Sequence, residues 1–480
     1  MRRCLLAVVS MCAAYMLTAC GGGASGPNSG GGGGLGIPAA THFSVTAPTT
    51  AAAGTFFTVT VVALDAPNKT VPGYSGTAHF TSSDPQAVLA ADSTLINGTG
   101  SFSASLATVG SQTIATTDIV TATIKGSSNS IAVAIDTSQH GFHPTGDLST
   151  ARVGHTATLL ANDKVLITGG VNSTGLLATA EVFDPASGTF TSTGPMTAAR
   201  SLHTATLLDH GPAATNGKVL ITGGSMGFLS DLATAELYDP ATGTFTATGR
   251  MSEVRSEHTA TLLADGKVLV AGGAADNVAE LYDPATGTFS PTTGKLVVGG
   301  RWGCTATLLN DGTVLIAGGR DDEDVFDAFS LNDAELFNPA TETFTATGGM
   351  TAVRYDHTAT LLGTGEVLMT GGFNGQPVAS AEFFNPGTGS FSNTVSMGAT
   401  RAEHTATLLN DGTVLVAGGA SFPSAEIFDP ATNMFTPTGP MGTPRVSHTA
   451  TRLSTGPVLI TGGVDLDVSG AFVKTAELYK

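Results

Sequence analysis

A pattern of short apolar and polar runs recurs along residues 149–480 and predicts strands rather than helices. Each copy opens with HTATLL or a close variant, continues through a wholly apolar run that ends in two glycines, and reaches a segment such as AELYDPATGTF. Runs of this length with turn residues between them are typical of short strands joined by tight turns. We infer four strands, a to d, in each copy. The seven copies open at His155, His203, His258, Cys304, His357, His404 and His448.

The spacing of these copies predicts the fold of the C-terminal part. A period of about 50 residues is that of the kelch repeat, which the chain therefore resembles. One four-stranded unit cannot bury both of its apolar faces, whereas several units around an axis bury them against one another as a β-propeller. The last copy stops at Lys480 after strand c, and residues 142–155 align with residues 245–258 without a gap. We therefore predict that residues 140–147 supply the missing strand and close the ring.

Residues 37–136 follow a different pattern, in which apolar and polar positions alternate along runs separated by turn residues. This pattern is typical of an antiparallel sandwich. Gly54 before a long run, Asp65 at its end and residues 71–76 resemble bacterial immunoglobulin-like domains. In that family such domains are mostly spacers or adhesion units. The predicted fold class is thus all-β: a seven-bladed kelch β-propeller over residues 137–480, preceded by an immunoglobulin-like β-sandwich.

Residues 1–19 indicate a secretory signal, with two arginines ahead of an apolar stretch. The sequence LTAC, which ends at Cys20, resembles a bacterial lipobox, and the resemblance implies a mature chain that begins with a lipid-modified Cys20. An ordinary signal that contains a cysteine is the alternative. Residues 20–36 follow as a glycine-rich tether with a typical span of about 20–24 Å. Because residue 21 is Gly rather than Asp, we expect the outer membrane or the cell surface as the location.

The charge balance narrows the classes of partner. The chain has 20 Lys and Arg residues against 38 Asp and Glu residues, a formal charge of −18. Such a surface repels nucleic acids and anionic lipids. The partners we expect are an extracellular glycan or protein, with membrane contact through the lipid anchor only, and we expect a monomer. Two of the four cysteines lie in the signal, so Cys304 stays the free thiol of a chain lipidated at Cys20, and no internal disulfide is expected.

Two charged residues recur in every copy. An Arg precedes the opening residue by three positions, and a Glu begins strand c. Residues present in every unit are expected to be structural, here as a partly buried Arg–carboxylate pair in each unit; ligand binding is the alternative. The arginines are Arg152, Arg200, Arg255, Arg301, Arg354, Arg401 and Arg445, and the glutamates are Glu181, Glu236, Glu280, Glu335, Glu382, Glu426 and Glu477.

The six histidines that open the copies have two interpretations. Neutral imidazole is a common metal ligand, but a ring of this width would hold the side chains too far apart for one ion. We therefore favour hydrogen bonds between neighbouring blades.

Function is expected where the repeats differ. The strand order places the b–c and d–a connections on one face, and the b–c loops at 171–178 and 320–332 vary strongly in sequence. The candidate ligand face comprises Trp302, Asp322, Asp324 and Tyr355. The acidic loop around Asp322 suggests Ca²⁺, but its spacing matches no defined calcium loop, and a solvated loop is the favoured interpretation.

The repeat pattern resembles the kelch propellers of galactose oxidase and related copper radical oxidases. In that family one blade carries Tyr-His at the opening position, another carries a Cys crosslinked to a Tyr of the next blade, and a later domain supplies a further His. Cys304, with Trp302 nearby and Tyr355 in the next blade, partly matches this set. Asp356 stands where the crosslinking Tyr would fall, no opening His follows a Tyr, and the chain ends with the propeller.

These departures favour a binding protein without catalytic residues, cofactor or metal. The predicted function is that of a lipid-anchored cell-surface binding or adhesion protein that recognises a glycan or protein through the loop face. The competing hypothesis is a carbohydrate-active or copper-dependent oxidase.

Overall fold

The computed structural model describes residues 39–480, except 53–54, 86, 107, 109, 135–140, 211, 228–229, 322–328 and 468–469. The chain divides into two compact units, Met1–Asp136 and Thr137–Lys480. The regular elements in the described ranges are strands, and these ranges contain no helix long and apolar enough to cross a membrane. The predicted signal, Cys20 and the tether lie outside the described residues.

The first unit contains three sheets. One sheet has the order β1 (His42–Thr46), β3 (Phe56–Leu64), β6 (Thr99–Ser105). A second has the order β5 (Ser93–Thr94), β4 (Thr77–Ser82), β8 (Ile114–Asp118), β9 (Lys125–Ser127). A third has the order β2 (Thr50–Ala52), β10 (Ile131–Ala134), β7 (Gly110–Gln112).

The core of this unit follows from strand alternation. Val59, Val61 and Ala63, which alternate along β3, are buried, because successive side chains of a strand point to opposite faces. These side chains share one apolar cluster with Phe80 of β4 and Ile114 of β8. The immunoglobulin-like character of this unit remains a prediction.

The second unit contains seven four-stranded sheets in its described residues. The first comprises β12 (Thr156–Leu159), β13 (Val165–Thr168), β16 (Ala180–Asp184) and β17 (Thr189–Ser192). The second comprises β18 (Thr204–Leu207), β19 (Val219–Thr222), β20 (Ala235–Asp239) and β21 (Thr244–Ala247). The third comprises β22 (Thr259–Leu262), β23 (Val268–Ala271), β24 (Glu280–Asp283) and β25 (Thr288–Pro291).

The fourth sheet comprises β26 (Thr305–Leu308), β27 (Val314–Ala317), β30 (Ala334–Asn338) and β31 (Thr343–Ala346). The fifth comprises β32 (Thr358–Leu361), β33 (Val367–Thr370), β34 (Ala381–Asn385) and β35 (Ser390–Asn393). The sixth comprises β36 (Thr405–Leu408), β37 (Val414–Ala417), β38 (Ala425–Asp429) and β39 (Met434–Pro437). The seventh comprises β40 (Thr449–Arg452), β41 (Val458–Thr461), β44 (Ala476–Tyr479) and β11 (Phe142–Pro144).

Short hairpins extend three b–c loops. They are β14–β15 (Val171–Asn172, Gly175–Leu176), β28–β29 (Arg320–Asp321, Phe329–Ser330) and β42–β43 (Val464–Asp465, Ala471–Phe472).

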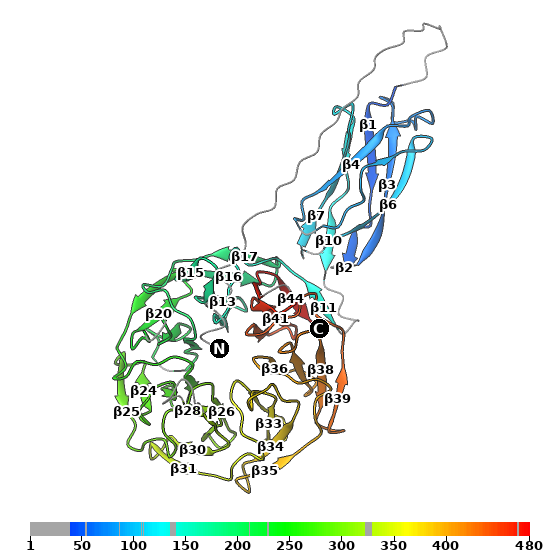
Figure 1. Ribbon diagram of the computed structural model, residues 1–480. Helices are drawn as coiled ribbons and strands as arrows, with labels where there is room; N and C mark the ends of the chain where they lie inside the picture. The colour runs from blue at the N-terminus through cyan, green and yellow to red at the C-terminus, as the bar shows by residue number, and fades with distance from the viewer. Residues whose placement is uncertain are drawn as a thin grey trace, which may run out of the picture. The chain divides into compact units, whose positions relative to one another are not determined.

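The sheets form a closed ring, as Figure 1 shows. The first strand of each sheet contacts the first strand of the next, and β40 of the last sheet contacts β12 of the first. Strand β11 pairs with β44 in antiparallel register, and the rings of Phe142 and Tyr479 lie 5.0 Å apart. The N-terminal segment of this unit thus supplies the outer strand of its last sheet and covers the edge of β44.

A buried Arg–Glu ion pair lies in each sheet of the ring. In the second sheet Arg200 Nη2 lies 2.7 Å from Glu236 Oε1, and Arg200 Nη1 donates to Gly223 O at 2.6 Å. The second carboxylate oxygen accepts a hydrogen bond from Thr197 N at 2.8 Å. The equivalent pairs are Arg152–Glu181, Arg255–Glu280, Arg301–Glu335, Arg354–Glu382, Arg401–Glu426 and Arg445–Glu477, with N–O distances of 2.6–3.4 Å. Each pair therefore joins strand c to the glycine pair after strand b and to the d–a connection.

The histidines join neighbouring sheets. His203 Nε2 lies 3.1 Å from Thr156 Oγ1 and 3.0 Å from Thr168 Oγ1, both in the preceding sheet. The ring also packs on Gly169, where an added Cβ would lie 2.4 Å from Arg200 O and 2.7 Å from His203 Cε1. A glycine is required there because φ is +63° and the two sheets approach closely.

Candidate functional site

The residue before each opening position forms an inner ring on the face of the b–c loops. These residues have φ between +50° and +64°, a region that side-chain-bearing residues rarely adopt. Backbone hydrogen bonds link these residues in succession from the first repeat to the seventh; Asp356 N donates to Gly303 O at 3.0 Å and Glu403 N donates to Asp356 O at 3.2 Å. The ring residues are Gly154, Leu202, Glu257, Gly303, Asp356, Glu403 and Ser447. The recurring conformation is thus part of the architecture, while the side chains vary.

Three of the inner-ring residues carry carboxyl groups, with Gly303 between the first and the second. They are Glu257, Asp356 and Glu403, from the third, fifth and sixth repeats. Arg320 Nη2 lies 2.7 Å from Glu257 Oε2, and both side chains are largely buried. The Ser447 hydroxyl donates to Glu403. The inner ring therefore gathers carboxyl groups on one side, and the Arg320 guanidinium reaches one of them.

A second, outer ring brings aromatic side chains beside these carboxylates. In five repeats the residue after the repeated Arg pairs by backbone with the residue after the glycine pair, and in the fourth and fifth repeats these pairs are Trp302–Arg320 and Tyr355–Phe373. The rings of Tyr355 and Phe373 are stacked with centroids 5.3 Å apart. The Arg320 guanidinium carbon lies 5.2 Å from the centre of the Tyr355 ring, within cation–π range.

Equivalent outer-ring positions elsewhere are small or aliphatic. The pairs are Val153–Val171, Ser201–Ser225 and Val446–Val464, and the unpaired positions of the third and sixth repeats hold Ser256 with Ala274 and Ala402 with Ala420. Large aromatic and ionisable side chains therefore gather around the fourth and fifth repeats. We call the set Glu257, Arg320, Tyr355, Asp356, Phe373 and Glu403 the acidic–aromatic patch.

Burial raises the pKa of Asp356 to about 8, and the neighbouring carboxylates Glu257 and Glu403 add to the effect. The Asp356 carboxylate occupies space that only a glycine leaves free, because an added Cβ at Gly303 would lie 2.4 Å from Asp356 Oδ1. Burial also raises the pKa of Glu403, although the Ser447 hydroxyl opposes the shift. A carboxyl that is protonated near neutral pH both donates and accepts hydrogen bonds.

Of the four residues predicted to form the ligand face, the structure places one in the patch. Tyr355 is partly exposed and belongs to the patch. Trp302 is only 8% exposed, and its ring packs against the backbone at Gly300, so it offers little surface to a ligand. Asp322 and Asp324 lie outside the described residues.

Glu257, Arg320, Phe373 and Glu403 were not singled out from the sequence as a site. The signal that could have found them is the column before the opening His, where acidic residues replace Gly, Leu or Ser in three repeats.

The donor set does not fit the copper site of the oxidases that the repeats resemble. Cys304 is buried, burial raises the pKa of its thiol to about 11, and its sulfur lies 4.0 Å from Arg301 O. Tyr355 instead stacks on Phe373. The opening histidines direct Nε2 to Thr hydroxyls of the preceding sheets, as His404 does to Thr358 at 3.1 Å. In the described part of the chain no group of three His, Cys, Asp or Glu side chains is arranged to hold a metal ion.

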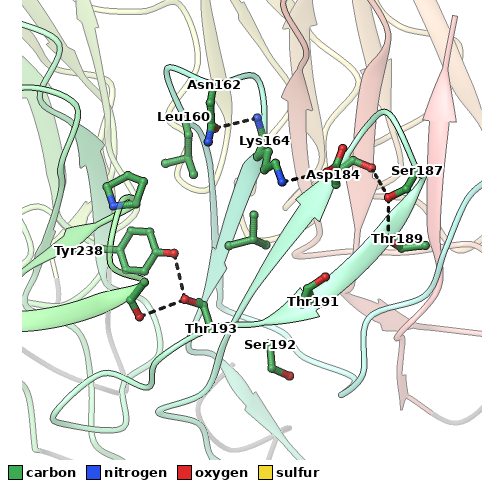
Figure 2. A pocket seen from close by; sticks show the side chains of 13 residues that line it. Leu160, Asn162, Lys164, Asp184, Ser187, Thr189, Thr191, Ser192, Thr193 and Tyr238 are labelled. Carbon is green, nitrogen blue, oxygen red and sulfur yellow. Dashed lines mark hydrogen bonds and ion pairs between the residues drawn. The ribbon is translucent and has the colours of Figure 1, made fainter.

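A groove of about 320 Å³ lies between the first two sheets, on the side of the a–b and c–d turns (Figure 2). Lys164 Nζ contacts Asp184 Oδ2 at 2.9 Å, and the hydroxyls of Thr193 and Tyr238 lie 3.0 Å apart. Because these polar groups satisfy one another, the groove is a weaker candidate than the acidic–aromatic patch.

Comparisons with known proteins agree with the ring of sheets. The kelch motif matches residues 152–197 and 207–252. The C-terminal unit has the kelch-type β-propeller fold. A solved fungal alcohol oxidase of the AA5 family, in complex with copper, superposes with a TM-score of 0.59 at 18% sequence identity, covering 71% of this chain and 76% of that one. At this identity the likeness concerns the fold alone. A search of curated proteins finds no match.

Proposed function

We propose that the propeller recognises a glycan through the acidic–aromatic patch, as a binding protein rather than an oxidase. The observation that carries this proposal is the gathering of stacked aromatic rings, one guanidinium and three carboxyl groups on adjacent repeats, at positions that are small or aliphatic elsewhere. Binding sites commonly combine apolar surface with a few convergent polar groups.

The chemistry of the patch favours a neutral or amino sugar. The C–H face of a sugar ring packs against an aromatic ring such as Tyr355, and sugar hydroxyls pair with carboxylates and guanidinium groups. Glu257 and Glu403 disfavour acidic sugars, because like charges repel. Asp356, with a pKa of about 8 raised first by burial, offers a donor to a sugar oxygen at neutral pH.

The remaining parts of the chain support presentation at a surface. We propose that residues 1–19 are a lipoprotein signal, that Cys20 carries the lipid, and that residues 20–36 tether an immunoglobulin-like spacer and a seven-bladed kelch propeller. Palmitate labelling of the wild type and of Cys20→Ala tests the anchor: equal labelling of both would contradict it.

A glycan screen with two matched variants tests the proposed recognition. Tyr355→Ala removes the partly exposed ring of the patch, whereas Val446→Ala truncates the equivalent outer-ring residue of the seventh repeat. We expect immobilised neutral or amino glycans to capture the wild type and Val446→Ala but to lose Tyr355→Ala by at least about tenfold in affinity, the scale of a well-packed aromatic contact. Equal binding by both variants would refute the placement of the site.

A further inference from the structure

One end of the first unit exposes three large aliphatic side chains. Ile96 is 74% exposed, Ile119 is 54% exposed and Val120 is 87% exposed. Ile96 lies in the β5–β6 turn, and the other two lie in the β8–β9 turn. Backbone bonds place both turns beside the start of β4: Leu95 N donates to Gly76 O and Ile119 N donates to Thr77 O, each at 3.0 Å. The three side chains therefore belong to one end of the unit.

The β8–β9 turn is held with its apolar side chains outward. Asp118 Oδ1 accepts hydrogen bonds from Val120 N at 2.9 Å and from Thr121 N at 2.6 Å. The Tyr74 hydroxyl donates to the other oxygen of Asp118. Ile124, at the far side of the turn, is buried in the core. Because the turn is anchored at both sides, exposure of Val120 is built into its conformation.

Both basic residues between positions 39 and 134 lie at this same end. Lys69 is in the turn that follows β3, and Lys125 begins β9 directly after the exposed turn. The nearby Asp65 and Asp118 are buried and accept backbone hydrogen bonds. This end therefore presents apolar and basic groups to solvent, although the whole chain is strongly acidic.

The chain enters the unit at this end. Thr41 N donates to Leu64 O at 2.7 Å, and Ala63 N donates to Gly98 O at 2.8 Å, which places the start of β1 beside the β5–β6 turn. At the opposite end, β10 finishes as it pairs with β2. The segment that leads back to Cys20 is therefore attached on the side of Ile96, Ile119 and Val120.

We propose that this end of the first unit docks on a phospholipid bilayer, with Ile96, Ile119 and Val120 in the interface and Lys69 and Lys125 near lipid phosphates. The proposal rests on the lipid anchor at Cys20 that forms part of the proposed function. Apolar burial and basic charge are the two forces that hold proteins at a membrane surface, and a short tether raises the local concentration of the docking surface.

Site-specific tryptophans in the mature chain, residues 20–480, test the docking. The tether is imposed by coupling Cys20 to a maleimide lipid in phosphatidylcholine vesicles with and without phosphatidylglycerol; Cys304 is buried and leaves Cys20 as the reactive thiol. Val120→Trp reports on the proposed interface. Val88→Trp, at a 56% exposed position that bridges to Ser105, is the matched control away from this end.

We expect the emission of Val120→Trp to shift to the blue and to be quenched by brominated lipids, while Val88→Trp behaves like the wild type with Trp302 alone. Combining Ile119→Ser with Val120→Ser in an untethered Cys20→Ser chain is expected to lower vesicle partitioning by about tenfold, as the loss of two apolar contacts requires. A water-like spectrum at position 120, or equal quenching at position 88, would overturn the proposal.

A blue shift without vesicles would also overturn it, in favour of self-association. Because the tether is imposed chemically, these outcomes are independent of whether cells lipidate Cys20; palmitate labelling answers that question separately.

Discussion

Six buried imidazoles are expected to make the propeller sensitive to acid. They are His155, His203, His258, His357, His404 and His448. Each has a lowered pKa, about 3 for His155, His258 and His404, because burial disfavours the charged form and the neighbouring Arg repels it. In the unfolded chain a His titrates near pH ~6.5.

The direction in which stability changes with pH follows from the number of protons that each state binds. Below pH ~6.5 the unfolded chain binds protons that the folded chain does not, so the stability is full above that pH and falls as the pH drops toward the folded pKa. In this range each His lowers the free energy of unfolding by about 1.4 kcal/mol for each pH unit. At pH ~5 the six together remove about 12 kcal/mol, comparable with the whole unfolding free energy of an ordinary domain, about 5–15 kcal/mol.

His448→Cys isolates one of these contributions, because the fourth repeat already carries Cys304 at the same position. Thr405 and Ala417 precede His448 as Thr259 and Ala271 precede Cys304. In the natural case Thr259 Oγ1 donates to the carbonyl of Ala271 at 3.1 Å. The Thr405 hydroxyl released by the substitution therefore has an equivalent carbonyl partner.

Urea unfolding followed by Trp302 fluorescence measures the effect, since the chain has one Trp. Between pH ~7.5 and ~5.5 we expect the variant to lose about 1.4 kcal/mol less unfolding free energy than the wild type. Buried carboxyls with raised pKa, such as Asp356, act in the opposite direction but are common to both proteins and cancel in the difference. An identical pH dependence for the two proteins would refute the reasoning.

Three further perturbations follow from the structure. Glu236→Gln leaves the Arg200 charge buried without a counter-ion and is expected to cost about 3–5 kcal/mol in urea unfolding, against less than about 1 kcal/mol for Asp184→Asn in an exposed pair. Asp356→Asn should flatten the melting-temperature profile from pH ~7 to ~9, above the range in which the histidines titrate: the raised pKa of about 8, due first to burial, means that the wild type loses stability as the pH rises toward 8. Phe142→Asp should detach the closing strand and cause aggregation in size-exclusion chromatography.

Each of these has a contrary result. An equal loss of unfolding free energy in the Glu236 and Asp184 variants would show that the repeated buried ion pairs do not stabilise the sheets more than an exposed pair does. A wild-type melting profile that matches Asp356→Asn would show that the carboxyl ionises freely in the folded chain. A monodisperse Phe142→Asp protein with an unchanged melting temperature would show that β11 is dispensable for closure.

The propeller could be predicted from the sequence because every repeat has the same strand pattern and the same Arg and Glu positions. The pairing of Phe142 with Tyr479 was predictable for a related reason: the last repeat lacked a strand that an unassigned segment matched. The patch was not predicted, although Glu257 and Glu403 share the position before the opening His, because their place beside Arg320 and Tyr355 depends on how the sheets close into a ring.

The exposure of individual side chains could not be predicted from the sequence either. Trp302 was expected on the ligand face, yet it is 8% exposed, since the backbone at Gly300 and the pairing with Arg320 hold its ring inward. Tyr355 occupies the equivalent position one repeat later and remains partly exposed, stacked on Phe373.

Hydrogen exchange measured by mass spectrometry, on the chain with and without its strongest glycan ligand, tests the central claim most directly. The account predicts slower exchange in peptides that contain Arg320, Tyr355 to Asp356 and Phe373, with the groove near Leu160 unchanged. Protection at Leu160 and Asp184, with the acidic–aromatic patch unaffected, would contradict it.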